Sequence, residues 1–323
     1  MNLMHHPACR QRYGTGHGIA AALLLVFGLL MSMVATAAPR VLETAYGQVS
    51  IEGTPERVVT LYEGALDAAL AAGVQPLAAI ATRGGSDVAD YIEQRAGDVA
   101  IVGTTRELNL EAIVSQQPDL ILASPRLPKQ QYELLSRIAP TVVPPGTGLT
   151  ADGWKAETRL FGKALGRQDQ IEAALAEIEQ RAAALAEQVQ TRYAGDDRLA
   201  YLVRWMPQGA IVMSTQLFST GLLDAAGFDV RDSGLVGDGR PHSDPLSLEN
   251  LARVDGDWLF LATLNEEGEE ALQAAESSPA FARLEVAARD RVIPVDGQLW
   301  TSASGPLAAT ALLDRIEATV LDR

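Results

Sequence analysis

The sequence predicts an α/β protein made of two β/α lobes with mainly parallel sheets, joined by a single long helix, with a ligand cleft between the lobes. One observation is that short apolar runs alternate with helical segments through both halves of the chain, which is typical of parallel sheets covered on both faces. Another is that LNLEAIVSQQPD (108–119) is matched by LSLENLARVDGD (246–257), as expected for two related lobes. The length of 323 residues is enough for two domains.

Residues 1–37 have the features of a secretory signal peptide. Arg10 and Arg12 precede the apolar run GIAAALLLVFGLLMSMVA, and Ala-Thr-Ala at 35–37 forms a cleavage site before Ala38. The alternative is an uncleaved anchor, because the apolar run is nearly long enough to span a bilayer. We expect cleavage, and hence an exported, periplasmic protein.

The composition excludes several kinds of site. The net charge of −15 disfavours general binding to nucleic acid, which needs clustered Lys and Arg. Beyond the leader there is no Cys, and His242 is the one histidine, so neither a zinc site nor a cysteine nucleophile is expected. The sequence has no G-x-S-x-G motif and no Walker A motif. An enzyme would have to use carboxylates, Tyr or Lys.

The first half of the chain predicts five parallel strands. Residues 41–56 alternate in polarity around Gly47 and form a small hairpin. Apolar runs then predict strands at 57–61, 76–81, 99–103, 119–123 and 140–144. Helical segments lie between them, at 64–74, 87–96, 110–117 and 129–139.

Two helices separate the halves. PPGTG at 144–148 breaks the pattern, and 150–166 then forms one helix. Residues 168–190, rich in Ala, Glu and Gln, form a second helix. We therefore divide the chain into the signal peptide (1–37), an N-terminal lobe (38–149), a linking helix (150–166) and a C-terminal lobe (167–323).

The second half repeats the β/α order. Strands are predicted at 198–203, 257–262 and 291–295, and helices at 218–227, 247–254, 279–290 and 306–321. Three segments correspond to segments of the first half in the same order, which supports two related lobes.

Arg follows four of six predicted strands in a strongly acidic chain. Ligands of open α/β sheets bind outside the carboxyl ends of the strands. An Arg side chain at such a position can bind an oxyanion with two parallel hydrogen bonds. A solvated or ion-paired Arg is the alternative for each position, and Trp300 could instead fill the core. The candidate ligand residues near the strand ends and in the GRPHS loop are Tyr62, Arg83, Arg106, Arg204, Trp205, Arg240 and Trp300.

Glu111 and Glu249 occupy the same position in the two repeated segments. Each lies in the first turn of a predicted helix, where a carboxylate favours the helix dipole. Asn109 and Ser247 hold the capping positions, so both glutamates could instead point outward and dock onto a two-fold partner. The residues alone leave both interpretations open.

The segments PERVVTL, ALDAALAAGVQPLAAI, VGTTRELNLEAIVSQQPDLILAS and LLSRIAPTVV resemble the periplasmic iron–siderophore and vitamin B12 binding proteins of ABC importers, with the ferric dicitrate-binding branch closest. SLENLARVDGDWLFLA and VIPVDGQLWTSASGPLAA extend the resemblance over nearly all of the chain beyond the leader. The resemblance implies two lobes bridged by one helix, with Glu111 and Glu249 docking onto arginines of the membrane permease.

The expected function is therefore that of a monomeric periplasmic binding protein that captures a ferric siderophore and delivers it to an inner-membrane ABC importer. Iron would be carried within the siderophore, so no cofactor and no direct metal ligands are expected. Cobalamin or haem bound by the same fold is one alternative. A carboxylate-based exported enzyme and an anchored sensor or adaptor are the others.

Overall fold

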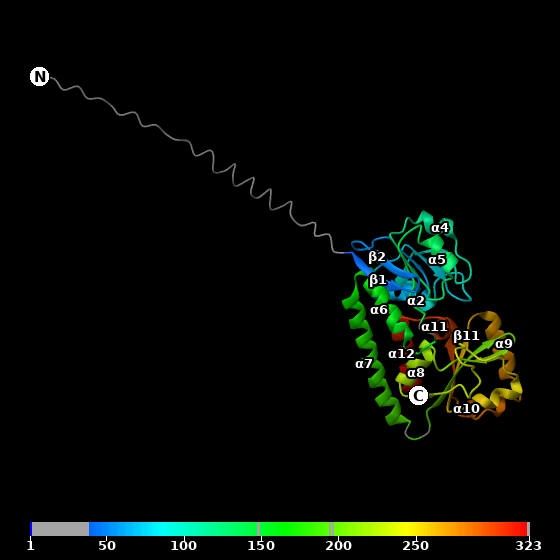
Figure 1. Cartoon of the computed structure of the whole chain (residues 1–323). Helices are drawn as coiled ribbons and strands as arrows, with labels where there is room; N and C mark the ends of the chain where they lie inside the picture. Colours follow the sequence, from blue (N-terminus) through cyan, green and yellow to red (C-terminus); the bar gives the residue numbers. More distant parts are fainter. Residues whose placement is uncertain (2–38, 147–148, 194, 196, 322–323) are drawn as a thin grey trace. The chain divides into compact units, whose positions relative to one another are not determined.

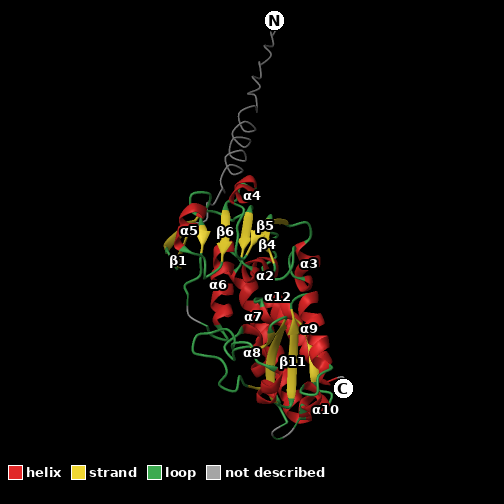
Figure 2. Cartoon of the chain, turned by 90° about the vertical axis from the view of Figure 1, so that its right-hand side faces the viewer, coloured by secondary structure: helices red, strands yellow, loops and turns green. Residues whose placement is uncertain are grey.

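The apolar runs of the sequence form two separate five-stranded sheets, each with helices on both faces (Figures 1 and 2). The structure is a computed structural model that describes residues 1, 39–146, 149–193, 195 and 197–321. The predicted α/β class with two mainly parallel sheets is confirmed. The predicted signal peptide lies, apart from Met1, outside the described residues.

The first sheet is wholly parallel and has the strand order β5-β4-β3-β6-β7. Its strands are β3 (Val58–Leu61), β4 (Ala78–Ala81), β5 (Ala100–Thr104), β6 (Leu120–Ala123) and β7 (Thr141–Val142). Its helices are α2 (Glu63–Ala71), α3 (Asp90–Ala96), α4 (Leu110–Ser115) and α5 (Lys129–Leu135). The antiparallel hairpin of β1 (Arg40–Thr44) and β2 (Gly47–Ile51) precedes it.

Two long helices follow β7. α6 (Gly153–Leu165) packs against α2, and α7 (Gln168–Arg192) packs against α6 and the C-terminal helix. Gly166 ends α6 in the left-handed conformation, with φ +68°. α6 thus connects the two sheets, as predicted, while the proposed lobe boundaries stay a prediction.

The second sheet has four parallel strands in the order β10-β8-β11-β12, and β9 pairs antiparallel with β8. Its strands are β8 (Leu199–Met206), β9 (Gly209–Val212), β10 (Asp229–Val230), β11 (Trp258–Thr263) and β12 (Val292–Asp296). β8 is longer than predicted and continues through Arg204 and Trp205, because β9 pairs with exactly this part of it. β9 and β10 are not among the strands that the sequence predicts.

The helices of the second half are α8 (Phe218–Ala225), η1 (Leu248–Val254), α9 (Glu266–Glu276), η2 (Phe281–Arg283), α10 (Glu285–Ala288), α11 (Gly297–Thr301) and α12 (Pro306–Leu321). Elements η1 and η2 are 3₁₀ helices. The two repeated segments therefore differ, since α4 is an α-helix. The Asn109 side chain caps α4 by accepting a hydrogen bond from the Ala112 amide at 3.0 Å, whereas the Ser247 side chain does not cap η1.

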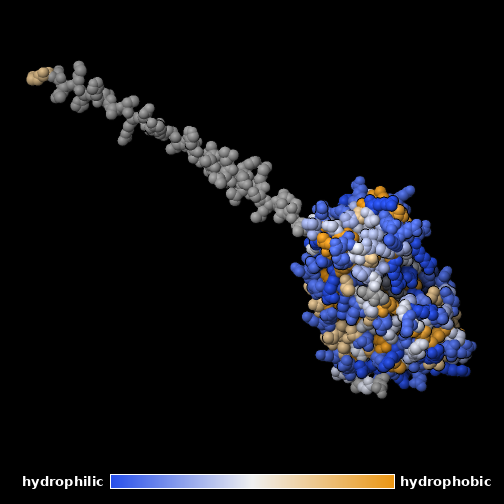
Figure 3. All heavy atoms as spheres, in the orientation of Figure 1, coloured by the Kyte–Doolittle hydropathy of each residue, from blue (hydrophilic) through white to orange (hydrophobic). Residues whose placement is uncertain are grey.

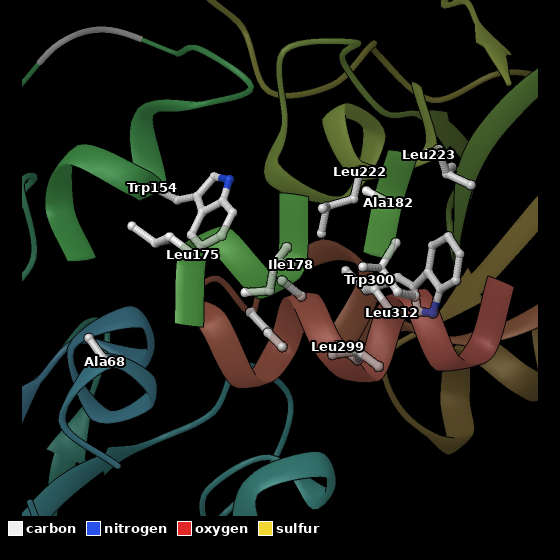
Figure 4. Close-up of a cluster of buried hydrophobic side chains, with 14 of the residues drawn as sticks. Ala68, Trp154, Leu175, Ile178, Ala182, Leu222, Leu223, Leu299, Trp300 and Leu312 are labelled. Atoms are coloured by element: carbon white, nitrogen blue, oxygen red, sulfur yellow. The ribbon is translucent and has the colours of Figure 1, made fainter. Parts of the chain in front are cut away.

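One apolar core runs through both halves. Leu120 and Leu122 of β6 and Leu202 of β8 face this shared core, together with helices α6, α7 and α12. Figure 4 shows part of it, where Ile178 of α7 and Leu312 of α12 lie among the buried side chains. Alternate residues of the strands face separate outer cores, as the two-residue period of a strand requires. The face of the molecule in Figure 3 is mainly hydrophilic.

A buried carboxylate joins α12 of the second half to α2 of the first. Asp67 of α2 has no exposed surface and accepts hydrogen bonds from the Leu307 and Ala308 amides, both at 2.8 Å. The Tyr91 hydroxyl donates a third at 3.0 Å. At Gly305, with φ +121°, a side chain would place its Cβ 2.4 Å from the Asp67 carboxylate, so only glycine fits. Asp67 therefore caps α12 across the two halves.

Among the described residues, none of the helices combines the length and the apolar character that crossing a bilayer requires.

Candidate functional site

The segments that follow the strands of the two sheets meet, and we call the region where they meet the inter-sheet site. The Tyr62 hydroxyl, just after β3, lies 3.1 Å from the Ser304 hydroxyl, which precedes α12. The turn after β4 packs equally closely, because a Cβ added to Gly84 would lie 3.3 Å from the Leu264 carbonyl oxygen, just after β11. Strand ends of both halves therefore border one site, as expected for ligand sites of α/β folds.

Arg204 is the central charged group of this site. It lies on β8 and is 4% exposed. One guanidinium nitrogen donates to the Thr301 hydroxyl at 3.3 Å and another to the Met206 sulfur at 3.8 Å, while Nε has no partner. Within the described part of the chain no carboxylate pairs with it.

The electrostatics of Arg204 are unfavourable in the unliganded protein. Burial, together with the positive charge of nearby Arg83, lowers the pKa of Arg204 to about 10. The side chain is still charged at neutral pH. A buried charge without a counter-ion is costly. The arrangement is therefore suited to an anion supplied from outside the chain.

Glu63 holds the turn that carries Arg83. Its Oε1 accepts hydrogen bonds from the Thr82 hydroxyl at 2.9 Å and from the Arg83 amide at 3.0 Å. Burial raises the pKa of Glu63, although these two donors oppose the shift. Its Oε2 is buried and has no hydrogen-bond partner.

Tyr62 and Glu157 form a second polar pair on the α6 side of the site. Burial and the neighbouring carboxylate of Glu157 raise the pKa of the Tyr62 hydroxyl, although its hydrogen bond with Ser304 opposes the rise. Burial likewise raises the pKa of Glu157, and its contacts with Tyr62 and Arg126 oppose the rise. The site thus contains one buried cation, Arg204, and two partly buried carboxyl groups, Glu63 and Glu157.

Unpaired polar atoms are concentrated here. The structure has six buried side-chain nitrogen or oxygen atoms that lack a partner within the described residues. Four of them belong to the inter-sheet site, namely Glu63 Oε2, Arg204 Nε, Gln298 Oε1 and Ser302 Oγ. Buried polar groups are normally hydrogen-bonded, so such a concentration indicates a place where a polar ligand completes the structure.

The two predicted tryptophans lie in the hydrophobic core instead. Trp205 is 4% exposed and its ring meets Phe281 edge-on at 6.4 Å, because residues 204 and 205 point to opposite faces of β8. Trp300 is 1% exposed and stacks on Phe260 at 5.1 Å, beside Leu299 and Leu312 (Figure 4). Neither ring offers a free face to a ligand, so we leave both out of the proposed ligand set.

The remaining predicted arginines divide into two groups. Arg83 acts electrostatically on Arg204 and belongs to the inter-sheet site. Arg106 is exposed in the turn after β5, where its amide donates to the Thr104 hydroxyl at 3.3 Å. Arg240 is also exposed and pairs with Asp244 at 2.7 Å. The structure therefore brings together Tyr62, Arg83 and Arg204, and does not bring Arg106 or Arg240 into contact with them.

Sequence reasoning overlooked two contributors to the site, Glu157 and Ser304. Glu157 carried a signal, because its i+3 and i+4 neighbours on α6 are Leu160 and Phe161, so no basic residue there can pair with it. Ser304 lies in a run of small residues that carries no comparable signal.

Glu111 and Glu249 both lie on the surface, in α4 and η1. In the described part of the chain neither carboxylate has a hydrogen-bond or ion-pair partner. This exposure is compatible with the predicted docking role, which stays a prediction.

No group of three or more His, Cys, Asp or Glu side chains that could hold a metal ion occurs within the described residues.

Comparison with known proteins identifies the group to which this architecture is similar. Residues 58–299 match the family model described as periplasmic binding protein. The achromobactin-binding periplasmic protein of Dickeya dadantii is 30% identical over 81% of this chain and 85% of its own length. The Fe(3+)-citrate-binding protein YfmC of Bacillus subtilis is 28% identical over 82% of this chain and 81% of its own length.

A solved structure supports the same relationship. The crystal structure of Staphylococcus aureus SirA complexed with staphyloferrin B superposes with a TM-score of 0.76 and 27% sequence identity. The similarity covers 87% of this chain and 98% of SirA. The arrangement of two sheets linked by α6 is thus the fold of this group of binding proteins.

Proposed function

Because this chain belongs to the periplasmic binding protein family, we propose that it captures a ferric chelate with free carboxylates and delivers it to an inner-membrane ABC importer. Members of the family are binding proteins rather than enzymes. The two relatives named above bind achromobactin and Fe(3+)-citrate, respectively. Iron enters as part of the ligand, so the chain itself needs no metal-binding residues.

One observation carries the proposal: Arg204 is buried, charged and without a carboxylate partner among the described residues. A ligand carboxylate placed against Nε and a terminal nitrogen would form the bidentate pair that guanidinium groups favour. It would also offset the repulsion between Arg204 and Arg83. The ligand would therefore supply the negative charge that no described residue provides for Arg204.

The other polar groups favour a carboxylate chelate that also carries hydroxyl groups. Gln298 Oε1 is a buried acceptor without a donor, which a ligand hydroxyl would satisfy. A catecholate chelate would expose aromatic rings that call for flat apolar partners, and both nearby tryptophans are already packed in the core. A neutral hydroxamate chelate would not compensate a buried cation.

Delivery rests on the two exposed glutamates. Glu111 and Glu249 lie in equivalent positions of the repeated segments and would each meet a cation of the membrane permease. The predicted signal peptide and the similarity to the periplasmic achromobactin-binding protein support a periplasmic location. A monomer with one docking carboxylate per half suits a permease of two similar subunits.

The test is a tryptophan-fluorescence titration of residues 38–323. The panel contains ferric citrate, a ferric hydroxamate, a ferric catecholate, cobalamin and haem, each with its metal-free control. We expect saturable one-to-one binding of ferric citrate or a related carboxylate chelate, tighter than the metal-free form.

Other outcomes would change the conclusion in defined ways. Binding of cobalamin or haem alone would keep the family and replace the ligand. Preference for the catecholate would overturn the carboxylate assignment. Turnover of any ligand would favour the enzyme alternative.

A further inference from the structure

Glu63 has one carboxylate oxygen that the fold leaves without a partner. Its Oε1 accepts hydrogen bonds from the Thr82 hydroxyl at 2.9 Å and the Arg83 amide at 3.0 Å, which fix the orientation of the carboxyl group. Its Oε2 is buried and has no hydrogen-bond partner among the described residues. An unpaired buried oxygen of this kind is costly, so Oε2 is suited to a donor that the ligand supplies.

The arginine beside Glu63 does not provide this donor. Burial raises the pKa of Glu63, and the charge of Arg83 is the weakest of the effects that oppose the rise. The hydrogen bond from Arg83 comes from its backbone amide, and the residue itself is exposed. Glu157, in contrast, has both the Tyr62 hydroxyl and the charge of Arg126 beside it. In the described part of the site, Glu63 Oε2 is therefore the buried carboxylate oxygen that lacks a donor.

A second unpaired acceptor approaches the same turn from the other half of the chain. Gln298 belongs to α11, and its amide nitrogen would lie 3.3 Å from a Cβ added to Gly85, in the turn that carries Arg83. Gln298 Oε1 is buried without a partner. The ligand hydroxyl proposed above has a single O–H donor, so it can satisfy Gln298 but not Glu63 as well. The ligand therefore has to offer a further donor on this side of the site.

Electric charge decides which donor suits Glu63. A chelate whose free groups are all carboxylates would bring negative charge towards Glu63 while it pairs with Arg204, and a neutral hydroxyl would leave that repulsion in place. A protonated amine carries a positive charge and three N–H donors, so it can bond to Oε2 and also remove the repulsion. Its charge would favour the ionised form of Glu63, against the burial that raises the pKa of this carboxyl.

We propose that the ferric chelate bound at the inter-sheet site is zwitterionic, with a carboxylate that pairs with Arg204 and a protonated primary amine that pairs with Glu63. This inference rests on the proposed capture of a carboxylate chelate and adds a second contact of opposite charge. Glu63 lies on α2 in the first half of the chain and Arg204 on β8 in the second. A ligand with both charges therefore bridges the two halves, and the site discriminates against chelates that lack the amine.

The experiment compares ferric chelates at neutral pH by the fluorescence titration described above. The reference is ferric citrate. The free-amine chelate is the ferric complex of citrate in which one carboxyl group is joined as an amide to ethylenediamine, so that a primary amine remains at the end of the arm. The acetylated chelate is the same compound with that amine acetylated, which removes the positive charge and keeps the carboxylates.

Two variants accompany the wild type. Glu63→Gln removes the charge and keeps an oxygen that can accept from the Thr82 hydroxyl and the Arg83 amide. Glu177→Gln is the matched control, because Glu177 is exposed on α7. The Tm of each variant shows that it folds. The comparison of the free-amine and acetylated chelates on the wild type needs no variant, so it tests the inference even if Glu63→Gln does not fold.

We expect the wild type and Glu177→Gln to bind the free-amine chelate about thirtyfold more tightly than the acetylated one, the effect of one hydrogen bond between charged groups. Glu63→Gln should reduce this preference to less than about threefold and should bind ferric citrate at least as tightly as the wild type does.

Three other results would count against the inference. Equal binding of the free-amine and acetylated chelates by the wild type, together with binding of ferric citrate, would overturn it and leave the proposed function standing. A preference that Glu63→Gln retains in full would show that the amine does not pair with Glu63. If ferric citrate and both amide chelates fail to bind, the proposed capture of a carboxylate chelate fails together with the inference.

Discussion

Two buried charged residues differ in how the fold treats them. Asp67, at the junction of α2 and α12, accepts three hydrogen bonds of 2.8 to 3.0 Å. Arg204, in the inter-sheet site, has one long hydrogen bond to oxygen at 3.3 Å and an unpartnered Nε. Both are at most 4% exposed. The two residues are similarly buried, and they differ in how many of their polar atoms have hydrogen-bond partners.

This difference separates an architectural group from a ligand-binding one. The bonds of Asp67 connect the two halves and leave no room for a ligand, as the close approach of Gly305 shows. Arg204 retains hydrogen-bonding capacity that the described residues do not fill. Removing Asp67 should therefore cost stability, whereas removing Arg204 should cost affinity.

The largest effect is expected for Asp67→Ala. The substitution leaves the Leu307 and Ala308 amides and the Tyr91 hydroxyl without their acceptor, so the free energy of unfolding should fall by about 3 kcal/mol. Thermal unfolding should show a Tm about 5 °C lower. A Tm within about 2 °C of the wild type would remove Asp67 from its structural role.

Arg204→Met should have the opposite profile. Replacing an uncompensated buried charge by an apolar side chain of similar length should leave the unfolding free energy of the unliganded protein unchanged or raise it by about 1 kcal/mol. Affinity for ferric citrate should fall about a hundredfold, because the ligand carboxylate loses its buried partner. Urea unfolding and fluorescence titration measure the two quantities. A strongly destabilised variant with normal affinity would reverse the assignment.

The pH dependence of stability tests whether burial raises the pKa of the Asp67 carboxyl. Burial raises the pKa of its carboxyl from 3.8 to about 7, against the opposing effects of its three donors and of Arg95. A raised native pKa gives stability that is present below the unfolded value and is lost as pH rises through the native value. The Tm of the wild type should therefore fall relative to that of Asp67→Asn between about pH 4 and pH 7. A constant difference would contradict the raised pKa.

The smallest effect is expected for Arg240→Gln, the matched control for Arg204. Arg240 is exposed, pairs with Asp244 and has no contact with the inter-sheet site among the described residues. Affinity for ferric citrate should change less than about twofold. A large loss of affinity for ferric citrate would show that the loop 231–247 contributes to the ligand site.

The candidate site could be predicted from the sequence only in part. Arg83 and Arg204 stand out because they follow apolar runs in an acidic chain, and the structure places both in the inter-sheet site. The same rule selected Trp205, which is core, because one residue along a strand reverses the facing direction of a side chain. Glu157 and Ser304 come from α6 and the segment before α12, and their proximity to Tyr62 depends on long-range packing.

The sequence by itself determined the β/α order of most strands and helices, the mainly parallel character of both sheets and the correspondence of Glu111 with Glu249, because hydrophobic periodicity and helix signals are local properties. Only the tertiary structure decided that the Asp67 carboxylate would accept hydrogen bonds from α12, 240 residues further along the chain, and that Arg204 Nε would find no partner among the described residues. Hydrogen bonds between distant segments depend on how the helices and sheets pack, and no local pattern records whether a buried charge finds its partner.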